Sequence, residues 1–175
     1  MQQRIPDGRT IYTEKRFELR ICDLKLSDGR TSSRGLIVHP GSVVLIPILD
    51  DGRLVLIKNR RWQVGQTLLE LPAGTIEAGE EPIVCAAREL EEETGYRCKA
   101  LEPWPPFYPL AGGSTEIMHP YIARKLSWVG QRLEADEDIS VEPKTINEVK
   151  ALLRSGALVD GKSMALLGRY LLLNS

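Results

Sequence analysis

The chain has 175 residues, of which 42% are hydrophobic and 27% charged, a composition typical of one soluble domain with a real core. Its formal net charge of −1 argues against a general nucleic-acid binder, because such a protein needs a broad basic surface to displace counterions from phosphates. The 3 cysteines are odd in number and widely spaced, so we expect neither a disulfide framework nor a zinc site, and a reducing compartment fits them.

The sequence shows no sign of membrane targeting. No segment approaches the roughly 18 consecutive apolar residues of a transmembrane helix. The N-terminus MQQRIPDGRT also lacks the apolar run of a signal peptide. We therefore expect a cytoplasmic protein that does not contact a membrane.

The first part of the chain predicts antiparallel strands. Apolar residues alternate in short stretches over residues 10–26, and the turn signal Ser27-Asp28-Gly29 follows. A return strand is expected over about residues 33–38. We therefore treat residues 1–40 as a small strand unit that precedes a main domain of residues 41–175.

A buried strand and a basic, aromatic segment come next. The apolar run of residues 42–49 is typical of a strand that is buried on both faces, and Asp50-Asp51-Gly52 predicts a hairpin into a second strand over residues 53–59. Arg61 and Trp62 follow. They are either the basic end of a strand with a half-buried Trp, or a phosphate contact beside a stacking surface.

The helix predicted over residues 82–94 has clear end signals. Pro82 suits a first helical position, where its missing N–H would have no partner, and Gly95 suits a left-handed cap. At about 100° per residue the helix presents two contrasting faces. One is an apolar stripe of Ile83, Ala86, Ala87 and Leu90, and an arc roughly opposite carries Glu89, Glu92 and Glu93.

The three glutamates of this arc indicate a metal site. Two carboxylates about 5 Å apart repel by about 3 kcal/mol at an effective dielectric near 20, and Arg88 alone cannot neutralise three. A divalent cation would relieve this repulsion. Ligation by oxygen alone, without His or Cys, favours Mg²⁺ or Mn²⁺ over zinc. The alternative is a solvated acidic helix face.

The second half of the chain predicts strands, a proline-rich loop and two closing helices. Strands are expected over about residues 97–104 and 117–126, and the segment between them is too rich in proline for regular structure. Phe107 and Tyr108 in that segment are, with Trp62, candidate stacking partners for a base. Helices are expected over residues 145–154 and 160–173.

The segment from Gly74 to Tyr96 resembles the Nudix box, the signature of the Nudix hydrolases. The matching positions are Gly74, Glu80, Arg88-Glu89-Leu90, Glu92-Glu93 and Gly95. One position departs from the pattern, because Tyr96 stands where an aliphatic residue is usual.

The resemblance implies an α/β/α sandwich on a mixed sheet and a metal-dependent hydrolase. It implies that Glu89, Glu92 and Glu93 bind or support the metal ions, together with the backbone carbonyl of Ala73. Glu80 and Arg88 would hold the loop onto the helix. The expected reaction is hydrolysis of a phosphoanhydride, in which the metal neutralises the diphosphate and a loop carboxylate takes a proton from water.

Two loop glutamates compete for the role of general base. Glu116 would either act as the base or complete the metal shell. Glu137 lies on the acidic loop 134–138, where several family members carry a catalytic glutamate. Either residue could instead be a surface carboxylate, and the sequence leaves the choice open.

Several residues resemble the ADP-ribose pyrophosphatase branch of the family. The box opens with Glu70-Leu71-Pro72-Ala73-Gly74, the Arg61-Trp62 segment precedes it, and Pro109 follows at a similar distance. Leu110-Ala111 departs from the Ser-Pro of that branch. The resemblance implies that Glu70 contacts substrate or the outer shell of the metal, and that the N-terminal strands pair two subunits into a homodimer.

The expected activity is hydrolysis of ADP-ribose, or a related nucleoside diphosphate sugar, to a nucleoside monophosphate and a sugar phosphate. The alternatives are a Nudix hydrolase that acts on another nucleoside diphosphate derivative, and a non-catalytic Nudix domain that binds a nucleotide as a sensor or regulator.

Overall fold

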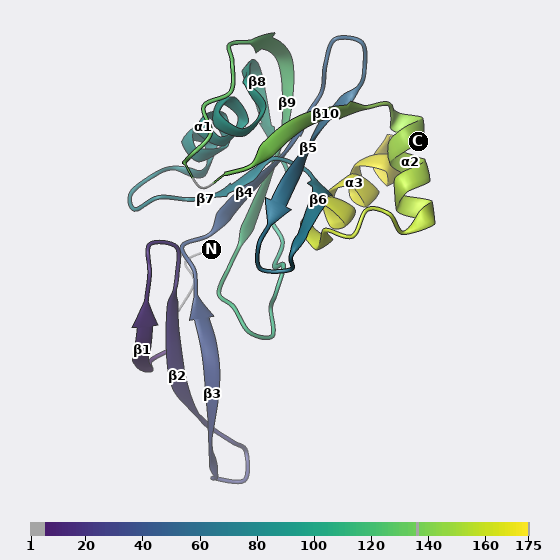
Figure 1. Cartoon of the computed structure of the whole chain (residues 1–175). Helices are drawn as coiled ribbons and strands as arrows, with labels where there is room; N and C mark the ends of the chain where they lie inside the picture. Colours follow the sequence, from purple (N-terminus) through teal and green to yellow (C-terminus); the bar gives the residue numbers. More distant parts are fainter. Residues whose placement is uncertain (1–5, 136, 175) are drawn as a thin grey trace.

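A computed structural model describes residues 6–135 and 137–174 of the chain. Figure 1 shows an N-terminal sheet that stands away from a larger body of two sheets and three helices. The N-terminal sheet is antiparallel in the order β1-β2-β3. Its strands are β1 (Arg9–Thr13), β2 (Glu18–Lys25) and β3 (Thr31–Val38).

The single strand that we expected over residues 10–26 is two strands. The chain reverses after Thr13, where the N–H of Glu14 donates to the carbonyl of Phe17 at 3.0 Å. Glu14, Lys15 and Arg16 are consecutive charged residues that break the apolar alternation, so the pairing partner of β1 is the next stretch of the same chain.

The main body contains a mixed sheet and an antiparallel sheet. The mixed sheet has the order β7-β4-β9-β8, with β4 parallel to β9, and the other sheet has the order β10-β5-β6. The strands are β4 (Ser42–Pro47), β5 (Leu54–Arg61), β6 (Gln66–Glu70), β7 (Ala73–Thr75), β8 (Tyr96–Pro103), β9 (Met118–Trp128) and β10 (Ile139–Lys144). The turn at residues 50–52 joins β4 to β5, but apart from a bridge between Ile48 and Leu54 the two strands belong to different sheets.

The helices lie on opposite sides of the sheets, which confirms the α/β/α sandwich (Figure 1). α1 (Pro82–Thr94) covers one side and ends as predicted at Gly95, which has a left-handed φ of 72°. α2 (Ile146–Ser155) and α3 (Gly161–Leu173) cover the other side, and Thr145 and Asp160 cap their N-termini. None of the helices in the described part of the chain is long and apolar enough to cross a membrane.

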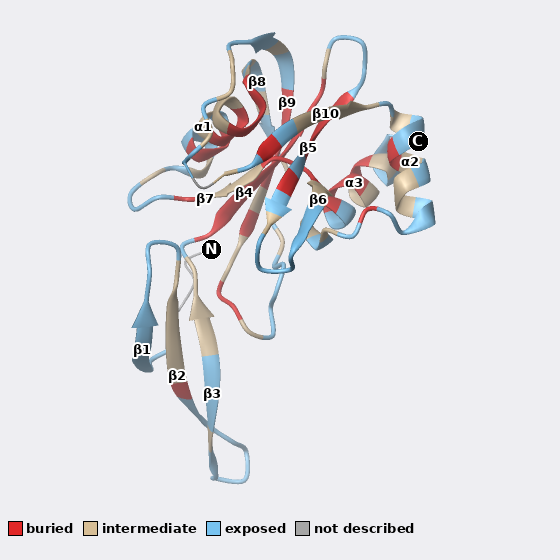
Figure 2. Ribbon diagram, viewed as in Figure 1, coloured by how far each residue is buried: buried red, intermediate tan, exposed pale blue. Residues whose placement is uncertain are grey.

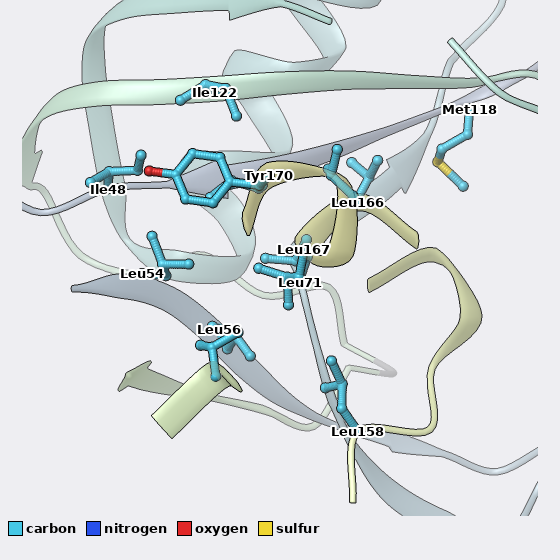
Figure 3. Close-up of a cluster of buried hydrophobic side chains, with 13 residues drawn as sticks. Ile48, Leu54, Leu56, Leu71, Met118, Ile122, Leu158, Leu166, Leu167 and Tyr170 are labelled. Carbon is cyan, nitrogen blue, oxygen red and sulfur yellow. The ribbon is translucent and has the colours of Figure 1, made fainter. Parts of the chain in front are cut away.

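Strand β4 divides the core into two hydrophobic clusters. Successive side chains of a strand point to opposite faces, so Val43 and Leu45 pack with α1, while Val44 and Ile46 pack with α2 and α3. Figure 2 shows β4 as the longest continuous buried segment near the centre of the body. Figure 3 shows the second cluster, in which Leu166, Leu167 and Tyr170 of α3 meet side chains of both sheets.

The expected apolar stripe of α1 is only partly correct. Ala86 and Leu90 are buried as predicted, but Ile83 and Ala87 are exposed. The buried face of the helix instead continues to Glu89 and Glu93, which are 8% and 3% exposed. Two of the three acidic residues therefore lie against the protein interior rather than on a solvated face.

Candidate active site

Most of the candidate residues line one cavity of about 940 Å³. Its walls come from α1, the end of β5, the loop around β7, the loop before β10 and the turn between β1 and β2. The predicted site residues among them are Arg61, Trp62, Ala73, Arg88, Glu89, Glu92, Glu93, Glu116 and Glu137. Residues from distant parts of the sequence therefore meet at one hollow, with α1 as its acidic wall.

The backbone before α1 is pressed against the acidic residues of the helix. A Cβ atom on Gly74 would stand 1.9 Å from the carboxyl carbon of Glu89, so a side chain at this position would force the carboxylate of Glu89 to move. The N–H of Ala73 donates to Oε2 of Glu93 at 2.8 Å. Gly74 thus lets the carboxylate of Glu89 approach the backbone, and the N–H of Ala73 binds the carboxylate of Glu93.

Arg88 joins the loop to three glutamates. Its guanidinium donates to both oxygens of Glu80 at 3.0 and 3.1 Å, to Glu89 at 2.7 Å and to Glu92 at 3.0 Å. These contacts hold the pKa of Glu80 well below its usual range, at about 2. Glu80 closes the loop by accepting a hydrogen bond from the N–H of Glu77 at 3.0 Å.

Burial raises the free-energy cost of ionising Glu89 and Glu93. It raises the pKa of Glu89 to about 7 against the opposing effect of Arg88, and the pKa of Glu93 to about 8 against the hydrogen bond from Ala73. Glu137 adds to both shifts, so its charge lies close enough to act on both residues. A buried carboxylate with a raised pKa needs either a proton or a cation as its partner.

The donor set fits a hard divalent cation, since Glu89, Glu92 and Glu93 offer only oxygen atoms. In the described part of the chain, no group of three or more His, Cys, Asp and Glu side chains stands in an arrangement ready to hold a metal ion. Two of the three carboxylates are bound to Arg88, and the third is bound to the backbone of Ala73. An incoming cation would therefore compete with Arg88 for the carboxylate oxygens.

Glu116 and Glu137 both reach the cavity, but in different surroundings. Glu116 accepts a hydrogen bond from the hydroxyl of Ser42 at 2.6 Å. Glu137 lies in a tight loop, where its Oε2 accepts a hydrogen bond from the N–H of Glu134 at 2.9 Å. Of the two, Glu137 is the one whose charge acts on the buried acids of α1.

A second part of the site is a buried carboxylate that binds two cations. Glu70 is 1% exposed and accepts two hydrogen bonds from Arg61, at 2.8 and 2.7 Å. Lys162, in the first turn of α3, also binds Glu70 and lies 3.0 Å from Asp160. Arg61 and Lys162 line the cavity, whereas Glu70 lies behind them. The sequence analysis did not identify Lys162.

The three aromatic candidates do not come together. Trp62 lines the cavity and is 81% exposed. Phe107 bridges to Met118 and packs against the hydrophobic core, and Tyr108 lies half-exposed outside the cavity walls. In the arrangement of this single chain, Trp62 is the candidate with an open aromatic face at the site.

Comparisons with known proteins agree with this geometry. A family model described as "NUDIX domain" matches residues 38–165. The chain is 37% identical to an ADP-ribose pyrophosphatase of Bacillus subtilis, over 87% of this chain and 84% of the relative. It is 36% identical to a methanol dehydrogenase activator of Bacillus methanolicus, over 90% and 89%, and 33% identical to a GDP-mannose pyrophosphatase of Cronobacter sakazakii, over 90% and 89%.

The fold also matches a solved structure. A crystal structure described as an ADP compounds hydrolase superposes with a TM-score of 0.80, covering 96% of this chain and 92% of that chain, at 21% sequence identity.

Proposed function

The chain belongs to the Nudix family, and we propose that it hydrolyses the diphosphate linkage of ADP-ribose to give AMP and ribose 5-phosphate. Hydrolysis of nucleoside diphosphate sugars is the activity that its pyrophosphatase relatives share. The observation that carries the proposal is the cavity itself, because the acidic residues of α1 and the paired cations Arg61 and Lys162 line the same hollow. A diphosphate is negatively charged, so it would be bound by Arg61 and Lys162 and by a cation held on the carboxylates of α1.

Nudix hydrolases use divalent metal ions, and we propose Mg²⁺ or Mn²⁺ here. Glu89, Glu92 and Glu93 would hold the ion, with the carbonyl of Ala73 as a further oxygen ligand. The ion would supply neutralisation of the diphosphate and a lowered pKa for the attacking water. Arg88 ties Glu89 and Glu92 to the loop through its hydrogen bonds to Glu80.

We propose that Glu137 is the general base that accepts the proton of the attacking water. The charge of Glu137 adds to the raised pKa values of Glu89 and Glu93, so Glu137 lies near both acids. Each candidate base has one oxygen in a hydrogen bond, Glu137 with the N–H of Glu134 and Glu116 with the hydroxyl of Ser42. A base must lie within hydrogen-bond reach of the water that it deprotonates, and the loop of Glu137 forms one wall of the same cavity. Water then attacks one phosphorus in line, and the other phosphate leaves on its sugar or nucleoside.

Recognition of the two ends of the substrate would use different side chains. Arg61 and Lys162 are fixed by Glu70 and present their remaining N–H groups as donors for phosphate oxygens. The exposed ring of Trp62 offers a stacking surface for a base. Stacking accepts either purine, so GDP-mannose is the main competitor of ADP-ribose.

We further propose that the protein is a homodimer that pairs through residues 1–40. Among the residues that the structure describes, no helix covers the N-terminal sheet, and the sheet and its turn expose Ile11, Tyr12, Leu24 and Leu26 by 39–52%. Exposed apolar side chains on an uncovered sheet are typical of an interface between subunits.

The 3 free cysteines fit a reducing compartment, which supports the cytoplasm as the location of the protein.

A substrate panel tests the proposed activity. The protein is incubated with Mg²⁺ and, in turn, ADP-ribose, GDP-mannose, UDP-glucose, NADH, diadenosine polyphosphates and 8-oxo-dGTP, and the products are identified. We expect AMP and ribose 5-phosphate from ADP-ribose at the highest kcat/KM. Turnover of only the dinucleotides or the triphosphate would refute the substrate assignment.

A regulatory role is the second candidate, because one similar relative is named as an activator of methanol dehydrogenase. The chain retains Glu89, Glu92 and Glu93, which a purely binding domain would not need. A protein that turns over no diphosphate in the panel, yet binds one of its nucleotides, would favour this second candidate.

A further inference from the structure

The turn between β1 and β2 reaches the cavity, although most of the N-terminal sheet stands away from the main body (Figure 1). Residues 13–18, which form this turn and its flanks, all line the cavity. The N-terminal sheet therefore contributes to the site as well as to the uncovered surface described above.

Two cations of this turn converge on one carboxylate of the loop that carries Glu137. Nζ of Lys15 lies 3.7 Å from Oε1 of Glu134, and Nη2 of Arg16 lies 3.6 Å from Oε2. Each oxygen of Glu134 thus faces its own cation. A single exposed ion pair contributes little, but two cations on one carboxylate restrict where that carboxylate can lie.

Glu134 in turn fixes Glu137. The N–H of Glu134 donates to Oε2 of Glu137 at 2.9 Å, and the N–H of Glu137 donates to the carbonyl of Glu134 at 3.1 Å. The backbone and the side chain of Glu137 are both held by one residue. The position of Glu134 therefore helps to set that of the Glu137 carboxylate, while the N–H of Arg60 binds the carbonyl of the next residue, Asp138, at 3.1 Å.

The base of the loop is anchored separately. Gln131 donates to the carbonyl of Glu93 at 2.7 Å, and the N–H of Arg132 donates to the carbonyl of Glu92 at 3.1 Å. The described part of the tip is residues 133–135 and 137. Side chains of these residues form ion pairs only with Lys15 and Arg16.

We propose that Lys15 and Arg16 are positioning residues that hold the tip of the loop, and with it Glu137, over the cavity. The inference rests on the proposed function, in which Glu137 accepts the proton of the attacking water. It assigns a task in the reaction to a turn that lies more than a hundred residues before Glu137 in the sequence.

Removing both charges tests the proposal through kinetics. In Lys15→Gln/Arg16→Gln we expect kcat to fall about 3- to 10-fold, the loss that corresponds to two weak ion pairs, with KM changed by less than about twofold. The conservative variant Lys15→Arg/Arg16→Lys should retain the wild-type kcat. The control Lys25→Gln/Arg30→Gln removes equal charge from the far end of β2 and its turn, and should also leave kcat unchanged.

Hydrogen exchange gives a second readout that does not depend on activity. The amides of Glu134 and Glu137 should exchange faster in Lys15→Gln/Arg16→Gln, while the amide of Arg132 stays protected by its bond to α1. Reversal of all three charges, in Lys15→Glu/Arg16→Glu/Glu134→Lys, should restore part of the protection. Size-exclusion chromatography of each variant checks that the assembly is unchanged.

The outcomes separate the two proposals. A raised KM with unchanged kcat would overturn the positioning role, because the cations would then contact the substrate directly. Unchanged kcat together with unchanged exchange would overturn it as well. If the wild type hydrolyses no diphosphate but exchange at Glu134 and Glu137 responds as expected, the structural coupling stands and the proposed function fails.

Discussion

Gly74 lies directly against the carboxylate of Glu89, at a distance that leaves no room for a side chain on the glycine. The contact places a buried carboxylate beside the backbone of the loop while Ala73 binds Glu93. Glu89 can therefore keep this position only while residue 74 has no side chain, and the arrangement of the carboxylates on α1 depends on that.

Replacing Gly74 by Ala should disable the site. The new methyl group would overlap Glu89, so we expect kcat to fall by at least about 100-fold and stability to fall by about 1–3 kcal/mol, the usual cost of overpacking. Steady-state kinetics and urea unfolding measure the two effects. The matched control is Gly168→Ala in α3, where no atom lies near the added methyl group and activity should not change. Wild-type activity in Gly74→Ala would contradict the packing argument.

Replacing Glu93 by Gln should remove turnover while the fold survives. Glutamine keeps the shape of the side chain but not the charge, and we expect kcat to fall about 10²- to 10⁴-fold. Glu81→Gln is the control, because Glu81 is exposed at the start of the same helix and makes no capping hydrogen bond. Circular dichroism should be unchanged in both variants. Equal activities in the two variants would contradict the role of Glu93.

The metal-free protein should lose stability as the pH rises. The folded pKa values of Glu89 and Glu93, about 7 and about 8, lie above the ordinary value of 4.5. At a pH between the ordinary value and the folded value of each carboxyl, the folded state therefore binds more protons than the unfolded state. The free energy of unfolding should then fall by up to about 1.4 kcal/mol per pH unit for each carboxyl. Urea unfolding in EDTA at a series of pH values measures this slope, and Glu93→Gln should reduce it. A flat or rising profile for the wild type would show that the two acids are not held as described.

Divalent ions should raise the melting temperature in a concentration-dependent way. An ion that binds only the folded state adds stability with the logarithm of its concentration, about 2.7 kcal/mol at 100 times its dissociation constant. Thermal unfolding in millimolar Mg²⁺ or Mn²⁺, against KCl of equal ionic strength, measures the effect. Glu93→Gln should respond much less than the wild type. An identical response in magnesium and potassium would argue against a metal site at α1.

Local signals in the sequence predicted what they control directly. Pro82 and Gly95 set the ends of α1 because each acts through its own backbone, and both ends lie where we expected them. A capping box of Thr145 and Glu148 sets the start of α2, within one residue of the start that we expected at residue 145. The apolar stripe of α1 was less predictable, because the surrounding fold buries Glu89 and Glu93 beside Ala86 and Leu90.

Contacts between distant residues could not be read from the sequence. Strand β5 pairs with β10 across about half of the chain, and Lys162 meets Glu70 only because α3 returns to the end of β6. One local feature did point to Lys162, since a cation in the first turn of a helix opposes the helix dipole and needs a negative partner. Phe107 had no such local signal. Its ring could stack on a base or pack in a hydrophobic core, and the fold places it against the core.

The burial of Glu70 between Arg61 and Lys162 makes the last helix part of the cavity wall. A shortened protein that ended before α3 would keep every residue of the box, yet Glu70 would lose one of its two counter-charges, and Arg61 alone would be left to hold it. Domain boundaries drawn from the box alone would therefore give a protein with intact signature residues but without the core packing of α3 and without the second cation beside Glu70.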